Sequence, residues 1–228
     1  MIVLKNVMKI YGTGDSEVKA LDKVSLTMEQ GEMLAVMGTS GSGKTTLLNV
    51  ISGMDTFQSG EYYFEDIPVH ALKGQKLHKF RREHIGFVFQ NFALLNQYTV
   101  YENVELPLCI QNVSQRVRRR KVMQVLEWMG IEELAKKRPS KLSGGQQQRC
   151  AIARALVSGN ELILADEPTG ALDKRNGMEL LDILTGLNKE GKTILIVTHD
   201  NQVAQRAGRI VYMEDGRLKL HEEAYSEK

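Results

Sequence analysis

The chain has little of what marks secreted, membrane-spanning or nucleic-acid-binding proteins. Its two cysteines, Cys109 and Cys150, stand far apart, which gives no metal-ligand spacing and indicates reduced thiols of a cytosolic protein. Thirty basic against 28 acidic residues give a formal net charge of +2, so no global excess points to nucleic acid. No apolar run approaches the roughly 18 to 20 residues of a membrane span, and residues 1–5 lack a signal-peptide layout. We therefore expect a soluble protein, which would need another chain to act across a membrane.

What the chain does have is one glycine-rich stretch with a specific chemistry. The residues Gly38-Thr39-Ser40-Gly41-Ser42-Gly43-Lys44-Thr45 fit the phosphate-binding-loop pattern G-x-x-x-x-G-K-[ST]. An apolar run at 33–37 precedes the loop, as a buried strand would, and residues 44–52 have helical spacing. The glycines let several N–H groups point at one anion, and the helix dipole is directed at the same place. Lys44 would then reach the β- and γ-phosphates, and the Thr45 hydroxyl would hold Mg²⁺.

Two further apolar runs end in side chains that suit phosphate chemistry. One run ends in Asp166 and Glu167. Because sites in α/β sheets lie at the carboxyl ends of strands, Asp166 would help to fix Mg²⁺, and Glu167 could take a proton from water. Another run, 193–198, ends at His199, for which the residues alone leave a structural and a functional role open.

The stretch Ser143-Gly144-Gly145-Gln146 opens a predicted helix that runs to about Val157. Ser143 and Gln146 fit a capping box, which is an ordinary way to satisfy N–H groups at a helix start. However, two glycines in the first turn each weaken a helix by roughly 1 kcal/mol, which favours close approach of a second anion instead. The residues alone leave both interpretations open.

The remaining segments predict an α/β fold with an antiparallel N-terminal part. Residues 1–30 indicate a strand pair around a turn at Gly12–Asp15, and Tyr11 before it has the ordinary interpretation of a strand-end aromatic. The chain also predicts strands at 60–64 and 85–89, helices at 101–112, 114–129 and 177–189, and a closing hairpin at 210–213 and 217–220. We interpret the basic cluster at 116–121 as a solvated helix face rather than a nucleic-acid patch, because no aromatic residues interleave it.

At Leu142-Ser143-Gly144-Gly145-Gln146 the chain resembles the signature sequence of ABC transporter ATP-binding subunits, with the phosphate loop and the Asp–Glu pair in that family's order. The resemblance covers essentially all 228 residues. It implies one nucleotide-binding domain with a RecA-like P-loop NTPase core, an antiparallel β-subdomain and a helical signature subdomain. The catalytic lobe would comprise residues 1–90 and 158–228, and the helical subdomain would comprise residues 91–157.

The resemblance also implies roles for individual residues, with ATP and Mg²⁺ as cofactors. Gln90 matches the Q-loop, Asp173 the D-loop and His199 the switch histidine, and Tyr11 matches the aromatic that stacks on adenine. The implied ATP contacts are Tyr11, Gly38, Thr39, Ser40, Gly41, Ser42, Gly43, Lys44, Thr45 and Thr46. The implied Mg²⁺ ligands are Thr45, Gln90 and Asp166, and the implied catalytic residues are Glu167, His199 and Gln90. Two copies would pair when ATP is bound, so that Ser143, Gly144, Gly145 and Gln146 of one copy contact the ATP of the other.

Residues 11–21 and 165–173 are similar to the macrolide-exporter, lipoprotein-release and bacitracin-resistance subfamily. That similarity implies a motor that hydrolyses ATP to power a separately encoded integral membrane permease, exporting or extracting peptides, antibiotics or lipoproteins. It would place the protein in the cytoplasm, peripheral on the cytoplasmic face of the membrane, without a nucleic-acid partner. A non-transport ABC-type ATPase of cell division or another regulatory complex is the alternative. Residues 91–95 would either contact the permease or pack within the helical subdomain.

Overall fold

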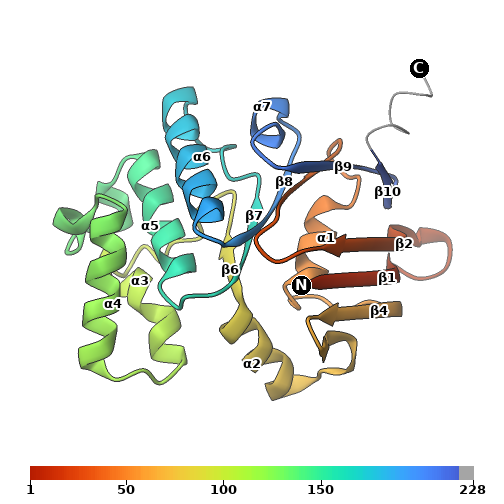
Figure 1. Ribbon diagram of the computed structural model, residues 1–228, viewed down its shortest axis with the longest axis horizontal. Helices are drawn as coiled ribbons and strands as arrows, with labels where there is room; N and C mark the ends of the chain where they lie inside the picture. Colours follow the sequence, from red (N-terminus) through yellow and green to blue (C-terminus); the bar gives the residue numbers. More distant parts are fainter. Residues whose placement is uncertain (221–228) are drawn as a thin grey trace.

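The computed structural model describes residues 1–220, without the side chains of Asp15 and Leu220, so residues 221–228 of the predicted catalytic lobe lie outside the described residues. Two sheets and a group of helices make up this part of the chain (Figure 1). The helices are α1 (Lys44–Ile51), α2 (Gly74–His84), α3 (Val100–Ile110), α4 (Gln115–Trp128), α5 (Gly144–Leu156), α6 (Lys174–Lys189) and α7 (Asn201–Ala204). Within residues 1–220, no helix combines the length and apolarity needed to cross a membrane.

The larger sheet has the strand order β10-β9-β3-β8-β7-β6 and is parallel except at β10. Its strands are β3 (Met33–Met37), β6 (Ile85–Val88), β7 (Leu162–Asp166), β8 (Thr193–Thr198), β9 (Arg209–Glu214) and β10 (Arg217–Leu220). Every residue of β3 and β8 is buried, as expected for central strands covered on both faces. The carboxyl ends of β3, β8 and β7 therefore meet at one edge, where the phosphate loop, His199 and Glu167 follow.

The smaller sheet is antiparallel, with the order β2-β1-β4-β5. Its strands are β1 (Ile2–Tyr11), β2 (Val18–Met28), β4 (Ser59–Phe64) and β5 (Ile67–Pro68). The β1–β2 register runs from Ile2 opposite Met28 to Tyr11 opposite Val18. Tyr11 therefore stands at the end of its strand, at the same end of the sheet as the turn that precedes Val18. The predicted antiparallel N-terminal part is confirmed.

Two apolar cores lie on opposite faces of the larger sheet, because alternate side chains along a strand point to opposite faces. Leu195 and Val197 of β8 belong to the core shared with the smaller sheet and α1. Ile194 and Ile196 belong to the core shared with α3, α4, α5 and α6. One strand thus joins the phosphate-loop side of the molecule to its helical side.

The sequence interpretation missed α2, β5 and α7, and it placed the start of α6 three residues late. Helix α2 buries Phe80 as its single fully buried residue and is otherwise rich in Lys and Arg, so it has no apolar stripe to indicate it. Helix α6 begins at Lys174 because the Asp173 carboxylate accepts a hydrogen bond from Asn176 N at 2.9 Å and caps the helix.

Candidate functional site

The phosphate loop follows β3 and is shaped by glycines in conformations that other residues avoid. Gly41 and Gly43 have φ angles of +82° and +108°. A Cβ on Gly43 would also collide with the carbonyl oxygen of Ala20, so β2 and the loop approach too closely for a side chain. Helix α1 starts directly afterwards at Lys44, and its unpaired N–H groups and positive dipole end lie at the loop. This geometry suits a phosphate group.

The Lys44 side chain is folded back onto the loop. It is 7% exposed, and its Nζ donates hydrogen bonds of 2.8 Å to the carbonyl oxygens of Gly38 and Thr39. A phosphate oxygen is a charged and therefore stronger acceptor than either carbonyl. The loop thus holds a buried cation where the β- and γ-phosphates of a nucleotide would lie.

Thr45 and Asp166 bring two oxygen ligands together beside the loop. Thr45 Oγ1 lies 3.4 Å from Asp166 Oδ1. Mg²⁺ binds oxygens at about 2.0–2.1 Å in octahedral geometry, so neighbouring ligands are about 3 Å apart and this pair fits the ion. Burial raises the pKa of Asp166, the Thr45 hydroxyl lowers it, and the charge of Glu167 raises it again, so that the pKa lies above its ordinary value. A cation here would offset that burial.

Glu167 occupies a strained turn directly after β7. Its φ is +44°, a left-handed conformation that costs a non-glycine residue of order 1–3 kcal/mol. Its N–H donates to the carbonyl oxygen of Val197 at 3.0 Å, which ties the turn to β8. Its Oε1 lies 2.7 Å from His199 Nδ1, and its Oε2 accepts a hydrogen bond of 3.1 Å from the Thr198 hydroxyl. The structure therefore brings Glu167 and His199 together and adds Thr198, which sequence reasoning missed.

The Tyr11 ring is fixed by two residues that sequence reasoning also missed. Its hydroxyl donates to Asp55 Oδ2 at 2.6 Å. Lys9 Nζ donates to Asp55 Oδ1 at 2.7 Å and lies 4.7 Å from the centroid of the Tyr11 ring. Tyr11 is 42% exposed, so a nucleobase has room to stack on the ring.

Most of the predicted site residues line one cleft of about 840 Å³, and Thr198, Asp55 and Lys9 lie behind them. Its walls include the predicted residues Tyr11, Thr39, Ser40, Gly41, Gly43, Lys44, Thr45, Thr46, Gln90, Asp166, Glu167 and His199. Gly38 and Ser42 belong to the predicted set but do not line the cleft, and Ser42 is buried. The cleft also has walls that no motif indicates, at 18–20 of β2 and at Asp215 and Gly216 of the closing hairpin.

The stretch Ser143–Gln146 does not line this cleft. It opens α5 with both hydrogen bonds of a capping box: Ser143 Oγ accepts from Gln146 N at 3.3 Å, and Gln146 Oε1 accepts from Ser143 N at 3.0 Å. Gly145 packs so closely on α6 that a Cβ would collide with the Asn176 side chain. Asp173 also lies outside the cleft, at the start of α6. The structural role of the capping box is therefore present, and the stretch is separate from the phosphate loop of its own chain.

Residues 91–95 pack against the helices, which was one of their two predicted roles. Leu94 contacts the helical core, and Leu95 N donates to Asn103 Oδ1 at 2.8 Å. Arg154 donates to the carbonyl oxygens of Phe92 and Ala93 at 2.8 and 2.5 Å. The segment is thereby fixed to α3 and α5.

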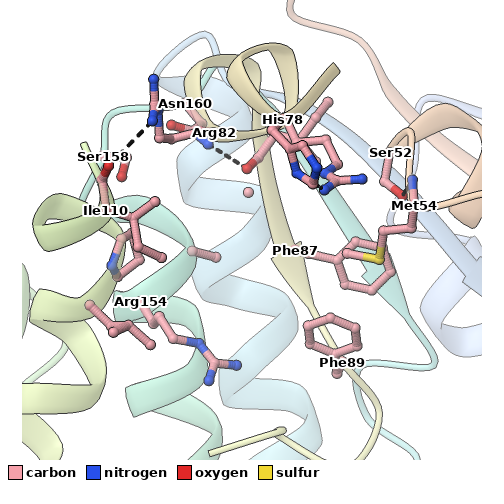
Figure 2. Close-up of a pocket in the computed structure, with 16 residues that line it drawn as sticks. Ser52, Met54, His78, Arg82, Phe87, Phe89, Ile110, Arg154, Ser158 and Asn160 are labelled. Atoms are coloured by element: carbon pink, nitrogen blue, oxygen red, sulfur yellow. Dashed lines mark hydrogen bonds between the residues drawn. The ribbon is translucent and has the colours of Figure 1, made fainter. Parts of the chain in front are cut away.

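A second cleft of about 480 Å³ opens between α2, β6, α3 and α5 (Figure 2). Phe87 and Phe89 stack along one side with ring centroids 4.2 Å apart, while Ile110 and Arg154 lie across from them. Three buried polar atoms of its lining residues have no hydrogen-bond partner within residues 1–220: Arg82 Nε, Ser158 Oγ and Asn160 Oδ1. The apolar lining of this cleft suits a protein partner.

A protein-family model described as ABC transporter matches residues 21–170, more than half of the chain. The chain belongs to the ABC transporter family. This ABC transporter chain is 44% identical over 218 residues to the macrolide export ATP-binding/permease protein MacB of Bartonella quintana, covering 96% of itself and 33% of that protein. It is 46% identical over 222 residues to the uncharacterised ABC transporter ATP-binding protein YvrO of Bacillus subtilis, covering 97% of each. The chain thus spans about a third of the length of the MacB relative.

Solved structures of the ATP-binding cassette MJ0796 have the same fold. One is a dimeric post-hydrolysis state bound to ADP and Pi, with a TM-score of 0.89 and 44% identity. Another is a dimeric bacterial ABC transporter cassette, with a TM-score of 0.89 and 46% identity. Each match covers 96% of this chain and 97% of the other. The predicted family, the P-loop α/β fold and the ATPase class are confirmed, while the individual residue roles, Mg²⁺ and the lobe boundaries stay predictions.

Proposed function

We propose that this ABC cassette is the ATP-hydrolysing motor of a membrane transporter whose permease is a separate chain. The observation that carries the proposal is that the phosphate loop, Asp166, Glu167 and His199 share one cleft, while the signature lies outside it. Similarity to a macrolide-export ATP-binding/permease protein supports transport of antibiotics. The resemblance at residues 11–21 and 165–173 extends the proposal to peptides and lipoproteins. The chain would then lie in the cytoplasm, peripheral on the cytoplasmic face of the membrane.

The cleft would contact both the triphosphate and the adenine of ATP. The loop N–H groups and Lys44 bind the β- and γ-phosphates, whose oxygens replace the carbonyls of Gly38 and Thr39 as acceptors for the ammonium. The Tyr11 ring stacks on adenine. Mg²⁺ held by Thr45, Asp166 and Gln90 would neutralise charge that develops on the phosphates.

Hydrolysis needs a base that takes a proton from the attacking water, and Glu167 is placed for that role. His199 and Thr198 each hold one of its carboxylate oxygens, so the base is oriented before the nucleotide arrives. The His199 side chain is 70% exposed and uses Nδ1 toward Glu167, which leaves Nε2 for the γ-phosphate.

A second copy of the chain would complete the site. Because Ser143–Gln146 lies outside the cleft of its own chain, the N–H groups at the start of α5 can contact ATP only across an interface. Dimeric cassettes of the same fold support a head-to-tail pair. ATP then holds two copies together, and loss of the γ-phosphate contacts after hydrolysis lets them separate.

The permease would contact the second cleft rather than residues 91–95. Phe89 lines this cleft and directly precedes Gln90 of the ATP site, so the two clefts are joined by adjacent residues. Apolar walls, among them the stacked rings of Phe87 and Phe89, accept an apolar side chain of such a partner.

One co-purification experiment separates the two halves of this proposal. The chain is co-expressed with the membrane protein encoded beside its gene and then purified from membranes, and fluorescent ATP-analogue binding is measured in parallel. Lys44→Ala should abolish nucleotide binding because the loop loses its buried cation, yet retain the permease. Ile110→Asp should do the reverse, because Ile110 is 56% exposed on the cleft rim and a charge there opposes an apolar contact. Met178→Asp, at a 38% exposed position on α6, is the control. Nucleotide binding by Lys44→Ala would contradict the proposed ATP site. Normal association of Ile110→Asp with the permease would contradict the proposed docking cleft.

A further inference from the structure

Positive charge is concentrated in two segments of this nearly neutral chain. Residues 73–84, which include α2, and residues 115–121 at the start of α4 contain ten Lys or Arg and one Glu. The remaining residues contain 20 Lys or Arg and 27 Asp or Glu. One strongly basic region therefore stands out on an otherwise acidic molecule, and such asymmetry indicates a binding partner of opposite charge.

The two segments lie on one side of the molecule, at opposite flanks of the second cleft; together we call them the basic face. In Figure 1, α2 and the junction between α3 and α4 lie along the lower edge. Gln111 of this junction donates to the carbonyl oxygen of Arg82 in α2 at 2.8 Å, and Arg82 donates to the carbonyl oxygen of Ile110 at 3.3 Å. Both flanks are thus tied to the cleft that the permease would occupy.

Half of the ten charges of the basic face are exposed and not used within residues 1–220. Five exposed side chains form neither a hydrogen bond nor an ion pair within residues 1–220: Lys73, Lys76, Arg116, Arg119 and Arg120. Arg118 differs, because it is ion-paired with Glu105 at 2.8 Å and so belongs to the fold. Lys79 has one exposed partner, Glu83, at 4.0 Å, a pair that contributes little in water.

We propose that the basic face binds the anionic headgroups of a membrane surface. The charges are spread over two helices and do not converge into a pocket, which matches a field of headgroups better than a single ligand. No aromatic side chains stand between the basic residues of α4 to stack on nucleic-acid bases. A permease seated in the cleft between the flanks would turn both of them toward the bilayer.

The inference rests on the proposed membrane attachment, but its test needs no permease, so the two can fail separately. Binding of the purified full chain is measured by co-sedimentation with vesicles of phosphatidylcholine, with and without phosphatidylglycerol. We expect binding only to the anionic vesicles, falling steeply as salt is added because exposed charges are screened. Each basic residue near an anionic surface raises the partition coefficient onto the vesicles about fivefold.

Two triple variants and a matched control test the face itself. Lys73→Gln/Lys76→Gln/Lys79→Gln and Arg116→Gln/Arg119→Gln/Arg120→Gln should each lower the partition coefficient by about a hundredfold, because three contributions of about fivefold are lost. The control Lys23→Gln/Lys174→Gln/Lys189→Gln removes the same charge from exposed positions on β2 and α6 and should bind like the unmodified chain. ATPase activity and thermal unfolding of every variant confirm that each is folded.

A fourth variant separates charge from specific geometry. Arg116→Lys/Arg119→Lys/Arg120→Lys keeps the charge and should keep vesicle binding. The proposal is wrong if the unmodified chain ignores anionic vesicles, if the control loses as much binding as the two face variants, or if the lysine variant fails to bind. It is also wrong if the face variants bind vesicles normally but lose the permease in neutral detergent, since the face would then contact acidic residues of that protein.

Discussion

Thr198 ends β8 with a fully buried side chain whose hydroxyl makes two hydrogen bonds. It donates to Glu167 Oε2 at 3.1 Å and accepts from Asp200 N at 3.1 Å. Thr198→Val keeps the shape but frees one oxygen of the proposed base. We expect kcat for ATP hydrolysis to fall by about tenfold to a hundredfold, with ATP affinity unchanged, because misplacing a catalytic group by about an ångström has effects of that size.

Steady-state ATPase assays with two companion variants check this role. Thr198→Ser retains the hydroxyl and should restore most of the activity. Thr193→Val removes a buried hydroxyl at the other end of the same strand, where it accepts a hydrogen bond from Gly31 N at 2.9 Å, and should affect stability without affecting kcat. Equal losses of kcat in both valine variants would make Thr198 a structural residue only.

Tyr11 should contribute to binding of the base but not of the phosphates. Tyr11→Ala is expected to weaken ATP binding by about 1–3 kcal/mol, the range found for stacking of nucleic-acid bases on aromatic rings. Tyr11→Phe should retain most of the affinity, and Asp55→Ala should fall between the two, because it frees the hydroxyl but leaves the ring. Titration calorimetry with ATP and with tripolyphosphate measures both. A similar loss for tripolyphosphate would mean that Tyr11 supports the loop rather than the adenine.

A site residue could be predicted from the sequence where its role depends on residues next to it in the chain. The phosphate loop is one continuous stretch, Asp166 ends a strand that is otherwise apolar, and His199 follows a strand that is buried throughout. Thr198, Asp55 and Lys9 could not be found in this way, because their roles depend on partners 31 to 46 residues away. The left-handed turn that directs Glu167 is likewise a product of the packing between β7 and β8.

The contact between β6 and α5 depends on a glycine in the strand. A Cβ on Gly86 would lie 2.6 Å from the carbonyl oxygen of Ala155, which is backbone and cannot turn aside. Gly86→Ala should therefore destabilise the protein by about 1–3 kcal/mol, as overpacking does, because α5 has to move away from the sheet. Gly186→Ala on α6 meets no atom within 4 Å and should stabilise the protein by about 0.5–1 kcal/mol through helix propensity. Urea unfolding measures both, and a neutral Gly86→Ala would show that β6 and α5 are not tightly coupled.

Helices and strands could be predicted where the sequence has an apolar pattern. They could not be predicted where contacts with the rest of the fold stabilise them. The two central strands β3 and β8 are buried throughout and were found with their observed bounds. Helix α2 has a basic surface and little apolar burial, β5 has two residues, and α7 has four. None of them therefore shows a hydrophobic periodicity that would predict it. The start of α6 depends on the Asp173 cap, which shifts the boundary but not the existence of the helix.

At the scale of the whole molecule, the separation between signature and phosphate loop could not be read from the sequence. Both lie at helix starts, α5 and α1, and either could bind an anion by itself. Only the fold shows that Ser143–Gln146 is absent from the walls of its own ATP cleft. A monomer of this chain would therefore have an incomplete site, and dimerisation should depend on ATP.

Glu167→Gln should trap that dimer. Replacing the carboxylate by an amide keeps the shape but removes the base, so hydrolysis should fall by about 10²- to 10⁴-fold while ATP binding persists. Bound ATP then accumulates, and light scattering should show a shift from monomer to dimer on addition of ATP and Mg²⁺.

To fix the orientation of the pair, Ser40→Cys and Ser143→Cys are combined in this background, since both serines are exposed. Cys109 is exposed and is first replaced by Ser, whereas burial raises the pKa of Cys150 to about 12 and leaves that thiol unreactive. A short bismaleimide should join the two copies only with ATP present, and Ser40→Cys with Ser114→Cys, directly before α4, should give no product. A dimer that forms with ATP but joins only the second pair would mean that the copies meet through another surface, and the model of a site shared between two chains would fail.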